Sequence, residues 1–296
     1  MREGIRNIVA LLTALFFYAA SGAWAQAEDD PPQELRVVFI AYENPDQLVE
    51  DVQPVVVYLE QELGLKVRHF VATDYAGVVE ALRNETADVG FMGPLQYVIT
   101  HDQADAYPIL GEIYSGKSTY FSRIFVRKDS GIESPQDLRG RTIAFVDPIS
   151  SSGYMCPLDI FKRAGLIEGA DDADNFFRRI YFAGGDEQAI RAVLNGFVDA
   201  AGIGQYAYNL LRPEERDEVV YIAESQPIPS HCLVARKGLN KQTVARLQAA
   251  LLARNDGPQH GLLKHLYNVD GYVKVTHADY EGVERMAREY GFLRSN

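Results

Sequence analysis

Residues 145–155 read Phe-Val-Asp-Pro-Ile-Ser-Ser-Ser-Gly-Tyr-Met, and this stretch carries most of what the sequence says about the fold. An apolar strand that starts at Thr142 ends near Val146, Pro148 turns the chain, and a helix begins after the serines. A strand that leads through a tight turn into a helix is the repeating unit of α/β domains. We therefore expect an α/β protein.

The same alternation of strands and helices extends on both sides of this stretch. The pattern predicts strands at 35–41, 66–72, 88–92, 179–182 and 198–203, and helices at 45–63, 75–84, 187–195, 241–254 and 278–290. Strands that alternate with helices predict a parallel sheet with helices on its faces. Two long extended runs, 120–127 and 230–236, bracket the second half of the alternation. They indicate two lobes joined by two crossing strands.

The serines at 150, 151 and 152 suggest a binding site for an anion. The first turn of a helix has unpaired N–H groups and the positive end of the helix dipole, and hydroxyl groups add further donors. Such a set can hold a tetrahedral or otherwise oxygen-rich anion without Lys or Arg. In the alternative interpretation one serine only caps the helix, which is a common role for serine. Three serines are more than a cap needs.

Three further segments lie where a ligand of an α/β sheet would be. Residues 90–97 (GFMGPLQY) again lead from a strand through a Gly-Pro turn into a helix, and ligands of open α/β sheets bind beyond the carboxyl ends of the strands. Tyr97 ends this segment, Tyr42 follows the first strand, and Thr119 enters the first extended run. Each of the three could contact a small anion or could pack at the edge of a lobe.

The first 25 residues differ from the rest of the chain. Arg2 and Arg6 give a basic start, residues 8–20 are largely apolar, and Ala-Trp-Ala at 23–25 fits a cleavage site. This pattern predicts a secretory signal peptide, cleaved before Gln26, and hence a periplasmic protein. The alternative is an N-terminal membrane anchor, but the apolar run is shorter than the ~20 residues that span a bilayer.

Composition excludes several classes of function. The chain has 296 residues and a formal charge of −12, so it lacks the basic surface that binds nucleic acid. Its six histidines are scattered, and its cysteines, Cys156 and Cys232, give no metal-binding spacing. We therefore predict no metal and no cofactor. The cysteines could form a disulfide, bind a soft anion or metalloid, or be two small buried residues.

The chain resembles the periplasmic substrate-binding proteins of phosphate, phosphite and phosphonate ABC transporters. The resemblance covers nearly the whole mature chain and rests on residues 91–97 (FMGPLQY), 147–154 (DPISSSGY), 192–200 (AVLNGFVDA), 228–230 (IPS) and 278–280 (ADY). It implies the type II periplasmic binding protein fold, in which two α/β lobes close on a ligand in the cleft between them. We expect a signal peptide at 1–25, lobe 1 at 26–125 and 232–296, and lobe 2 at 126–231.

The resemblance also implies a set of site residues. The oxyanion would be held by Ser150, Ser151 and Ser152 together with Thr119 and Tyr97, and it would be covered by Tyr42.

Three positions depart from the family members that take aminoalkylphosphonates. Asp186 stands where those proteins have a histidine, and Tyr206 and His231 stand where they have acidic residues that hold an ammonium group. These departures favour a smaller oxyanion, or one with an uncharged tail, such as phosphite, methylphosphonate or phosphate. Asp186 is then compatible only with a protonated ligand that donates to it. His231 could supply a donor or a positive charge, or could be a solvated hinge residue.

We expect a monomeric binding protein that captures a small phosphorus oxyanion and delivers it to an ABC permease. The alternative is a binding protein that senses an oxyanion or metalloid and signals to a membrane histidine kinase. An enzyme would need an activated nucleophile or a metal, and the sequence contains neither G-x-S-x-G nor H-E-x-x-H. We predict no catalytic residue.

Overall fold

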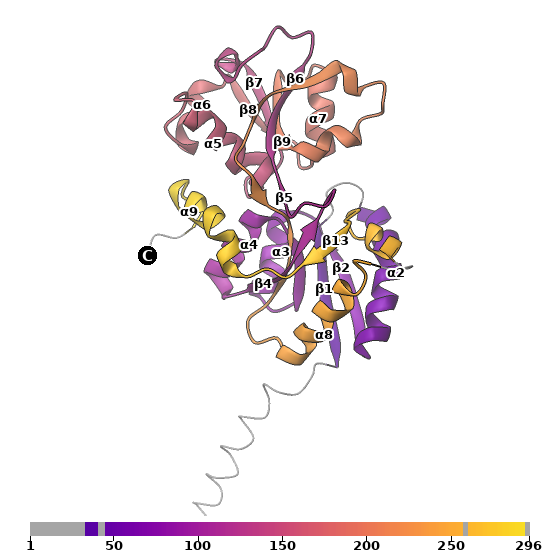
Figure 1. Ribbon diagram of the computed structural model, residues 1–296. Coiled ribbons are helices and arrows are strands. Elements are labelled where there is room, and N and C mark those ends of the chain that lie inside the picture. The colour runs from indigo at the N-terminus through magenta and orange to yellow at the C-terminus, as the bar shows by residue number, and fades with distance from the viewer. Residues whose placement is uncertain (1–32, 41–44, 257–259, 294–296) are drawn as a thin grey trace, which may run out of the picture.

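Two α/β lobes make up the molecule, one above the other in Figure 1. This computed structural model describes residues 33–40, 45–256 and 260–293, so the predicted signal peptide and Tyr42 lie outside the described residues. None of the described helices is both long and apolar enough to cross a bilayer.

The first lobe is built from both ends of the described chain. It holds β1 (Glu34–Ile40), α2 (Pro45–Leu63), β2 (Lys66–Ala72), α3 (Tyr75–Arg83), β3 (Val89–Met92), α4 (Pro94–Ala104), β4 (Tyr107–Ile113), β12 (Cys232–Ala235), α8 (Lys241–Leu252), β13 (Gly271–Val273) and α9 (Glu281–Glu289). Its sheet has the order β13-β4-β12-β3-β1-β2. β1 lies between β3 and β2, and its side chains are buried on both faces of the sheet. Leu35 and Val37 belong to one hydrophobic cluster, and Val38 and Ile40 to another.

The second lobe is built from the middle of the chain. It holds β6 (Ser122–Arg127), β7 (Thr142–Phe145), α5 (Cys156–Arg163), α6 (Ala173–Phe176), β8 (Arg179–Phe182), α7 (Asp186–Leu194), β9 (Ala200–Gly204) and β10 (Val219–Glu224). Its sheet has the order β10-β6-β9-β7-β8. Short 3-10 helices occur at Pro135–Leu138, Ala170–Asp172, Gln205–Leu210, Arg216–Glu218, His260–His265 and His277–Tyr280. β6 places Ser122 in this sheet, whereas the division made from the sequence assigned residues up to 125 to lobe 1.

The expected parallel pairing is present in both sheets, but both also contain antiparallel strands. β1 pairs in parallel with β2 and β3, and β7 pairs in parallel with β8 and β9. The strands that follow each passage of the chain from one lobe to the other are antiparallel to their neighbours. β12 is antiparallel to β3, and β6 is antiparallel to β9. A chain that leaves one lobe and returns to it must supply strands of opposite direction to each sheet.

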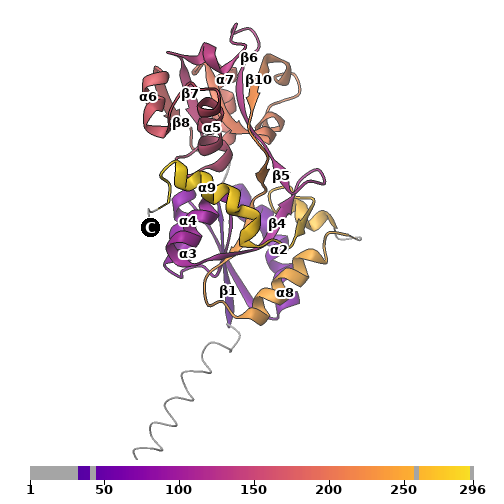
Figure 2. The same ribbon diagram turned by 60° about the vertical axis from the view of Figure 1, so that its left-hand side comes forward.

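Two short strands connect the lobes. β5 (Thr119–Tyr120) pairs antiparallel with β11 (Ile228–Pro229), and Figure 1 shows β5 between the two sheets. α9 also contacts both lobes, and Figure 2 shows it across their junction. On the lobe 1 side Arg288 lies 3.5 Å from Asp102, and on the lobe 2 side Glu289 accepts a 2.6 Å hydrogen bond from Lys162.

Candidate ligand-binding site

A cavity of about 530 Å³ lies between the lobes, within the size range of ligand sites. Both lobes contribute to its wall. Six of the nine site residues expected from the sequence line it: Ser150, Ser151, Ser152, Asp186, Tyr206 and His231.

The serine loop leads from β7 into a π-helical turn, Ser151–Met155, and then into α5. Ser150 caps this turn, since its hydroxyl accepts a 3.0 Å hydrogen bond from the backbone N–H of Gly153. Gly153 packs so closely on β7 that a Cβ there would lie 2.4 Å from Cβ of Val146. The loop therefore has one serine that acts as a cap and two more, Ser151 and Ser152, whose hydroxyl groups the cap does not use.

Ser151 connects the two lobes. Its hydroxyl oxygen accepts a 2.7 Å hydrogen bond from the backbone N–H of Leu95, the second residue of α4. The neighbouring Ser152 is held through its carbonyl oxygen, which accepts a 2.7 Å hydrogen bond from the hydroxyl of Ser122. The first turn of α4 and the serine loop are thus in direct contact, and Gly93, the residue before α4, lines the cavity together with the three serines.

Two tyrosines that we did not select from the sequence complete this set of donors. Tyr75 begins α3 and Tyr120 lies on β5, and both line the cavity. Burial raises the pKa of Tyr120, while hydrogen bonding to Ser152 and Ser151 lowers it by less. Burial also raises the pKa of Tyr75, and hydrogen bonding to Ser150 opposes the shift. Both hydroxyl groups therefore stay protonated and can donate.

The position of each of these tyrosines in the sequence could have identified it as a candidate site residue. Tyr75 follows the strand at 66–72 just as Tyr42 follows the strand at 35–41. Tyr120 is the neighbour of Thr119, and successive side chains of a strand point in opposite directions. The structure turns Tyr120 toward the cavity and leaves Thr119 exposed.

Tyr97 and Thr119 do not line the cavity. Tyr97 is fully buried within lobe 1, its ring packs edge-on against Tyr280 at 5.0 Å between centroids, and its hydroxyl lies 2.7 Å from Nδ1 of His277. Thr119 is paired with Pro229 in the strand pair that joins the lobes. Tyr42 lies outside the described residues.

Asp186 faces the same space as the serine hydroxyl groups. It is the first residue of α7, and its Oδ1 accepts a 3.3 Å hydrogen bond from the backbone N–H of Gly204. A Cβ placed on Gly204 would lie 3.3 Å from Oγ of Ser152 and 3.8 Å from Oδ1 of Asp186. A ligand oxygen bound by Ser152 would therefore lie close to the Asp186 carboxylate.

The cavity offers few positive charges to an anion. Among the described residues of its wall, Lys264 is the only Lys or Arg, and it forms an ion pair with Asp270. Asp51 and Asp186 add further carboxylates. An anion in this cavity would therefore meet mainly neutral donors, such as the serine and tyrosine hydroxyl groups.

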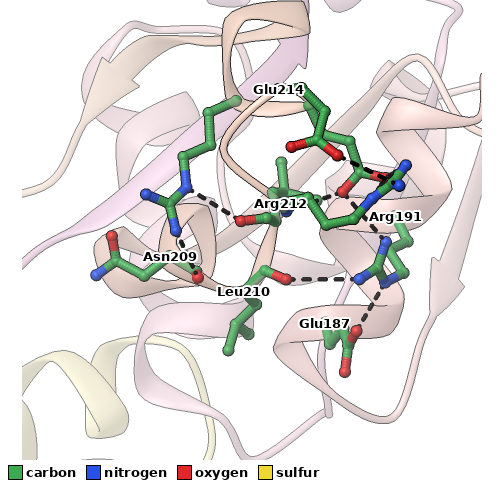
Figure 3. A network of polar contacts seen from close by, with 9 residues as sticks. Glu187, Arg191, Asn209, Leu210, Arg212 and Glu214 are labelled. Carbon is green, nitrogen blue, oxygen red and sulfur yellow. Dashed lines mark hydrogen bonds and ion pairs between the residues drawn. The ribbon is translucent and has the colours of Figure 1, made fainter.

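A network of charged residues holds the lobe 2 side of the cavity in place (Figure 3). Arg191 of α7 donates a 2.7 Å hydrogen bond to Glu187 and also contacts the carbonyl of Leu210 at 3.5 Å. Asn209 is fixed by its carbonyl, which accepts a 3.0 Å hydrogen bond from Arg216. This ties α7, which carries Asp186, to the 3-10 helix Gln205–Leu210.

Tyr206 lies in that 3-10 helix and reaches toward the other lobe. Its ring is 5.5 Å from the ring of Tyr114, which follows β4 in lobe 1, and both rings line the cavity. This aromatic pair is a second contact between the lobes at the cavity, besides the one between Ser151 and Leu95.

Neither cysteine lines the cavity. Cys156 at the start of α5 and Cys232 at the start of β12 are both buried and both free thiols. Burial raises the pKa of both thiols. In the part of the chain that the structure describes, no three His, Cys, Asp or Glu side chains are grouped so that they could hold a metal ion.

Comparison with known proteins gives a consistent result. The model of a family described as "ABC transporter, phosphonate, periplasmic substrate-binding protein" matches residues 37–280. The chain is 26% identical over 298 residues to the phosphate-import protein PhnD of Mycolicibacterium smegmatis, covering 94% of this chain and 93% of that protein. It is 30% identical over 247 residues to the phosphonates-binding periplasmic protein of Escherichia coli, covering 80% of this chain and 71% of that protein.

A solved structure has the same fold. PhnD1 of Prochlorococcus marinus in complex with methylphosphonate superposes with a TM-score of 0.76 at 18% identity, covering 88% of this chain and 99% of that chain. The expected α/β fold, with two lobes of the type II periplasmic binding protein class, is confirmed.

Proposed function

Because this chain belongs to the family of periplasmic substrate-binding proteins of phosphonate ABC transporters, we propose that it captures a small phosphorus oxyanion between its lobes and delivers it to the permease of such a transporter. Proteins of this family bind and hand over substrates in the periplasm and are not enzymes. No observation on this chain favours a role as a sensor.

The convergence of neutral donors from both lobes supports this proposal most strongly. Ser151 and Ser152 come from lobe 2, Tyr75 comes from lobe 1, and Tyr120 comes from the strand between them. Neither lobe alone encloses an anion. Closure of the lobes removes water from the anion and completes its hydrogen bonds, so the ligand shifts the population toward the closed form. A permease can then recognise that closed form.

The position of Asp186 supports a protonated oxyanion. A carboxylate next to a bound anion is unfavourable unless the ligand carries a proton that it can donate. Monoanions of phosphate, phosphite and methylphosphonate each carry a P–OH group, whereas sulfate has no proton to donate near neutral pH. The M. smegmatis relative is named for phosphate and the E. coli relative for phosphonates, and the P. marinus structure contains methylphosphonate. We therefore propose phosphite, methylphosphonate or phosphate as the ligand.

A thermal-shift screen of the mature protein tests the ligand class. The panel contains phosphate, phosphite, hypophosphite, methylphosphonate, 2-aminoethylphosphonate, sulfate and arsenite. A ligand at 100 times its dissociation constant adds about 2.7 kcal/mol of stability, which is a shift of several degrees. We expect this shift with at least one P–OH oxyanion and none with sulfate. If none of the phosphorus compounds stabilises the protein, the proposed ligand class is wrong.

Delivery is tested with the permease itself. The permease is placed in proteoliposomes with ATP, and its ATPase rate is compared with ligand-loaded and with ligand-free binding protein. We expect the loaded protein to stimulate ATP hydrolysis more than the ligand-free protein does. Equal rates in the two cases would contradict delivery without affecting the ligand assignment.

A further inference from the structure

Glu112 is a buried carboxyl group next to His231, a residue of the cavity wall. It lies on β4, and its side chain is 0% exposed. Its Oε2 accepts a 2.7 Å hydrogen bond from the hydroxyl of Tyr114, but its Oε1 has no hydrogen-bond partner among the described residues. The hydroxyl of Tyr272, opposite Glu112 on β13, is likewise buried without a described partner. A buried carboxyl group with an unsatisfied oxygen is costly, so its presence calls for an explanation.

His231 links Glu112 to the anion site. Nδ1 of His231 lies 3.8 Å from Oε2 of Glu112, which is within ion-pair range but too long for a hydrogen bond. Its other nitrogen, Nε2, lies 3.5 Å from the hydroxyl of Tyr120. Tyr120 in turn lies beside Ser151 and Ser152, whose side chains lower its pKa. A single chain of contacts therefore runs from the buried carboxyl group through the imidazole to the serines.

Among the buried groups at this place, Glu112 and His231 are the two that can change charge. The titratable groups around it are Tyr114 after β4, Tyr120 on β5, Cys232 on β12, Tyr267 before β13, Tyr272 on β13 and Tyr280 before α9. Burial raises the pKa of Tyr120, Cys232, Tyr267, Tyr272 and Tyr280, so these groups stay neutral. The hydroxyl of Tyr114 donates a hydrogen bond to Glu112. Asp186, one of the carboxylates of the cavity wall, acts electrostatically on Tyr120.

We infer that Glu112 is a positioning residue of the anion site, which acts through His231 so that the pair takes up a proton from solvent when an anion enters. This inference rests on the proposed oxyanion binding. With an anion bound, the added proton makes His231 an imidazolium whose Nε2–H faces Tyr120 and the cavity, while its Nδ1–H faces the Glu112 carboxylate. The site thus gains a positive charge only while it is occupied, and it needs no permanently charged Lys or Arg.

The titration of the pair agrees with this geometry. Burial raises the pKa of Glu112 to about 7, and the hydrogen bond from Tyr114 opposes that shift. Burial lowers the pKa of His231, so its imidazole is neutral before the anion arrives. Above neutral pH the empty site therefore has a carboxylate behind a neutral imidazole. A bound anion repels the negative charge of the Glu112 carboxylate, so its arrival favours the uptake of a proton by Glu112 and His231.

The experiment compares native protein with Glu112→Gln, using methylphosphonate as the probe and calorimetry at pH 6 and pH 8.5. The ligand's own ionisation and the contribution of Asp186 are the same in both proteins, so they cancel in the ratio of dissociation constants. Residue 112 cannot become negatively charged in Glu112→Gln. We therefore expect the native protein to lose affinity relative to this variant as pH rises. The loss should be up to about tenfold per pH unit above the pKa of the Glu112 and His231 pair. In buffers of different ionisation enthalpy at pH 8, native protein should take up more protons on binding than the variant does.

Asp51→Asn is the matched control, because it removes a carboxylate of the cavity wall that lies on α2, whereas His231 directly precedes β12. We expect it to change affinity by the same factor at both pH values. A ratio for Glu112→Gln that is also constant with pH would overturn the role of Glu112 and leave the proposed function intact. Absence of methylphosphonate and phosphite binding by the native protein would instead overturn the proposed function and this inference with it.

A second measurement is made on native protein and does not depend on how Glu112→Gln folds. Native protein labelled with ¹⁵N-histidine is titrated with methylphosphonate at pH 8, and the His231 signals are assigned by their loss in His231→Gln. We expect His231 to change from a neutral imidazole to an imidazolium as the ligand binds. A His231 that stays neutral in the saturated complex would overturn the inference.

Discussion

The backbone N–H of Leu95 in one lobe donates a 2.7 Å hydrogen bond to the hydroxyl of Ser151 in the other. Leu95 is fully buried and Ser151 is 3% exposed, so the contact lies out of solvent. It joins the first turn of α4 to the turn before α5, the two places where the sequence shows a strand, a turn and a helix in succession. In the proposed function, a ligand oxygen held by both lobes would link them in the same way.

Replacing Ser151 by alanine is expected to weaken oxyanion binding. The variant removes a hydroxyl group and leaves the N–H of Leu95 without its buried acceptor, which costs about 1–3 kcal/mol, or roughly 5- to 150-fold in affinity. Isothermal titration calorimetry with the best phosphorus ligand measures the effect. Ser130→Ala, in an exposed turn where its hydroxyl bonds only to nearby backbone groups, is the control. Equal affinities for Ser151→Ala and native protein would contradict the assignment of the serine loop.

Gly204→Ala tests the position of the anion without removing any polar group. The new Cβ would lie 3.3 Å from Oγ of Ser152 and 3.8 Å from Oδ1 of Asp186, in the space where the ligand oxygen is expected. We predict a loss of affinity of about tenfold, or about 1.4 kcal/mol, with little change in thermal stability. Gly169→Ala, where a Cβ meets no atom within 4 Å, should bind like native protein. Native affinity in Gly204→Ala would place the anion elsewhere.

Asp186→Asn is expected to relax the discrimination between phosphorus oxyanions and sulfate. The carboxylate accepts a P–OH proton and repels a fully ionised anion, whereas an amide can donate to either. Losing one such contact costs about 1–3 kcal/mol, so the preference should fall by about tenfold or more. Competition of sulfate against methylphosphonate measures it. If the ratio of the two affinities is unchanged, Asp186 does not contact the ligand's proton.

Asp88 is expected to govern acid stability. It is 1% exposed and accepts hydrogen bonds from Arg36 at 2.7 Å and from Arg236 at 2.9 Å. Burial alone would raise the pKa of Asp88, but hydrogen bonds from the side chain and backbone of Arg36 outweigh it and hold the pKa below its ordinary value. Because the folded pKa is the lower one, the stabilisation is present above the unfolded pKa of about 3.9 and is lost as pH falls below it.

Urea unfolding of Asp88→Asn tests this directly. Breaking a buried pair leaves two guanidinium groups without their partner, and since those groups are partly exposed we expect a loss of about 3 kcal/mol at pH 7. The difference from native protein should shrink as the pH is lowered from 5 to 3. Asp105→Asn, in an exposed pair with Lys237, should change stability little. A difference that stays constant from pH 7 to pH 3 would show that the charge of Asp88 is not what matters.

The two thiols are expected to be inert in the folded protein. Cys156 and Cys232 are buried and free, and burial raises the pKa of each, which suppresses the reactive thiolate. Ellman's reagent should label neither residue in native protein and both in urea. A reductant should leave the melting temperature unchanged. Labelling of one thiol in the folded state, or a lower melting temperature after reduction, would count against this prediction.

Local patterns in the sequence were sufficient to predict most elements. The helix at 45–63 and the strand at 66–72 have those same bounds in the structure, since each depends on apolar spacing and a turn within a few residues. The role of Ser150 as a cap is equally local, because the groups that it joins are three residues apart. The strand at 107–113, which carries Glu112, was not predicted, and with it the group behind His231 was missed.

The sequence by itself determined the two-lobed α/β arrangement and the serine loop, because hydrophobic periodicity and turn residues act over short distances along the chain. Only the tertiary structure decided which side chains share the cavity. Thr119 and Tyr120 are adjacent, yet pairing with β11 turns only Tyr120 inward. Tyr97 follows the turn at α4 but packs into lobe 1 against His277. The direction of a side chain is set by its strand's partners and by the packing of one lobe on the other, and these join residues far apart in the chain.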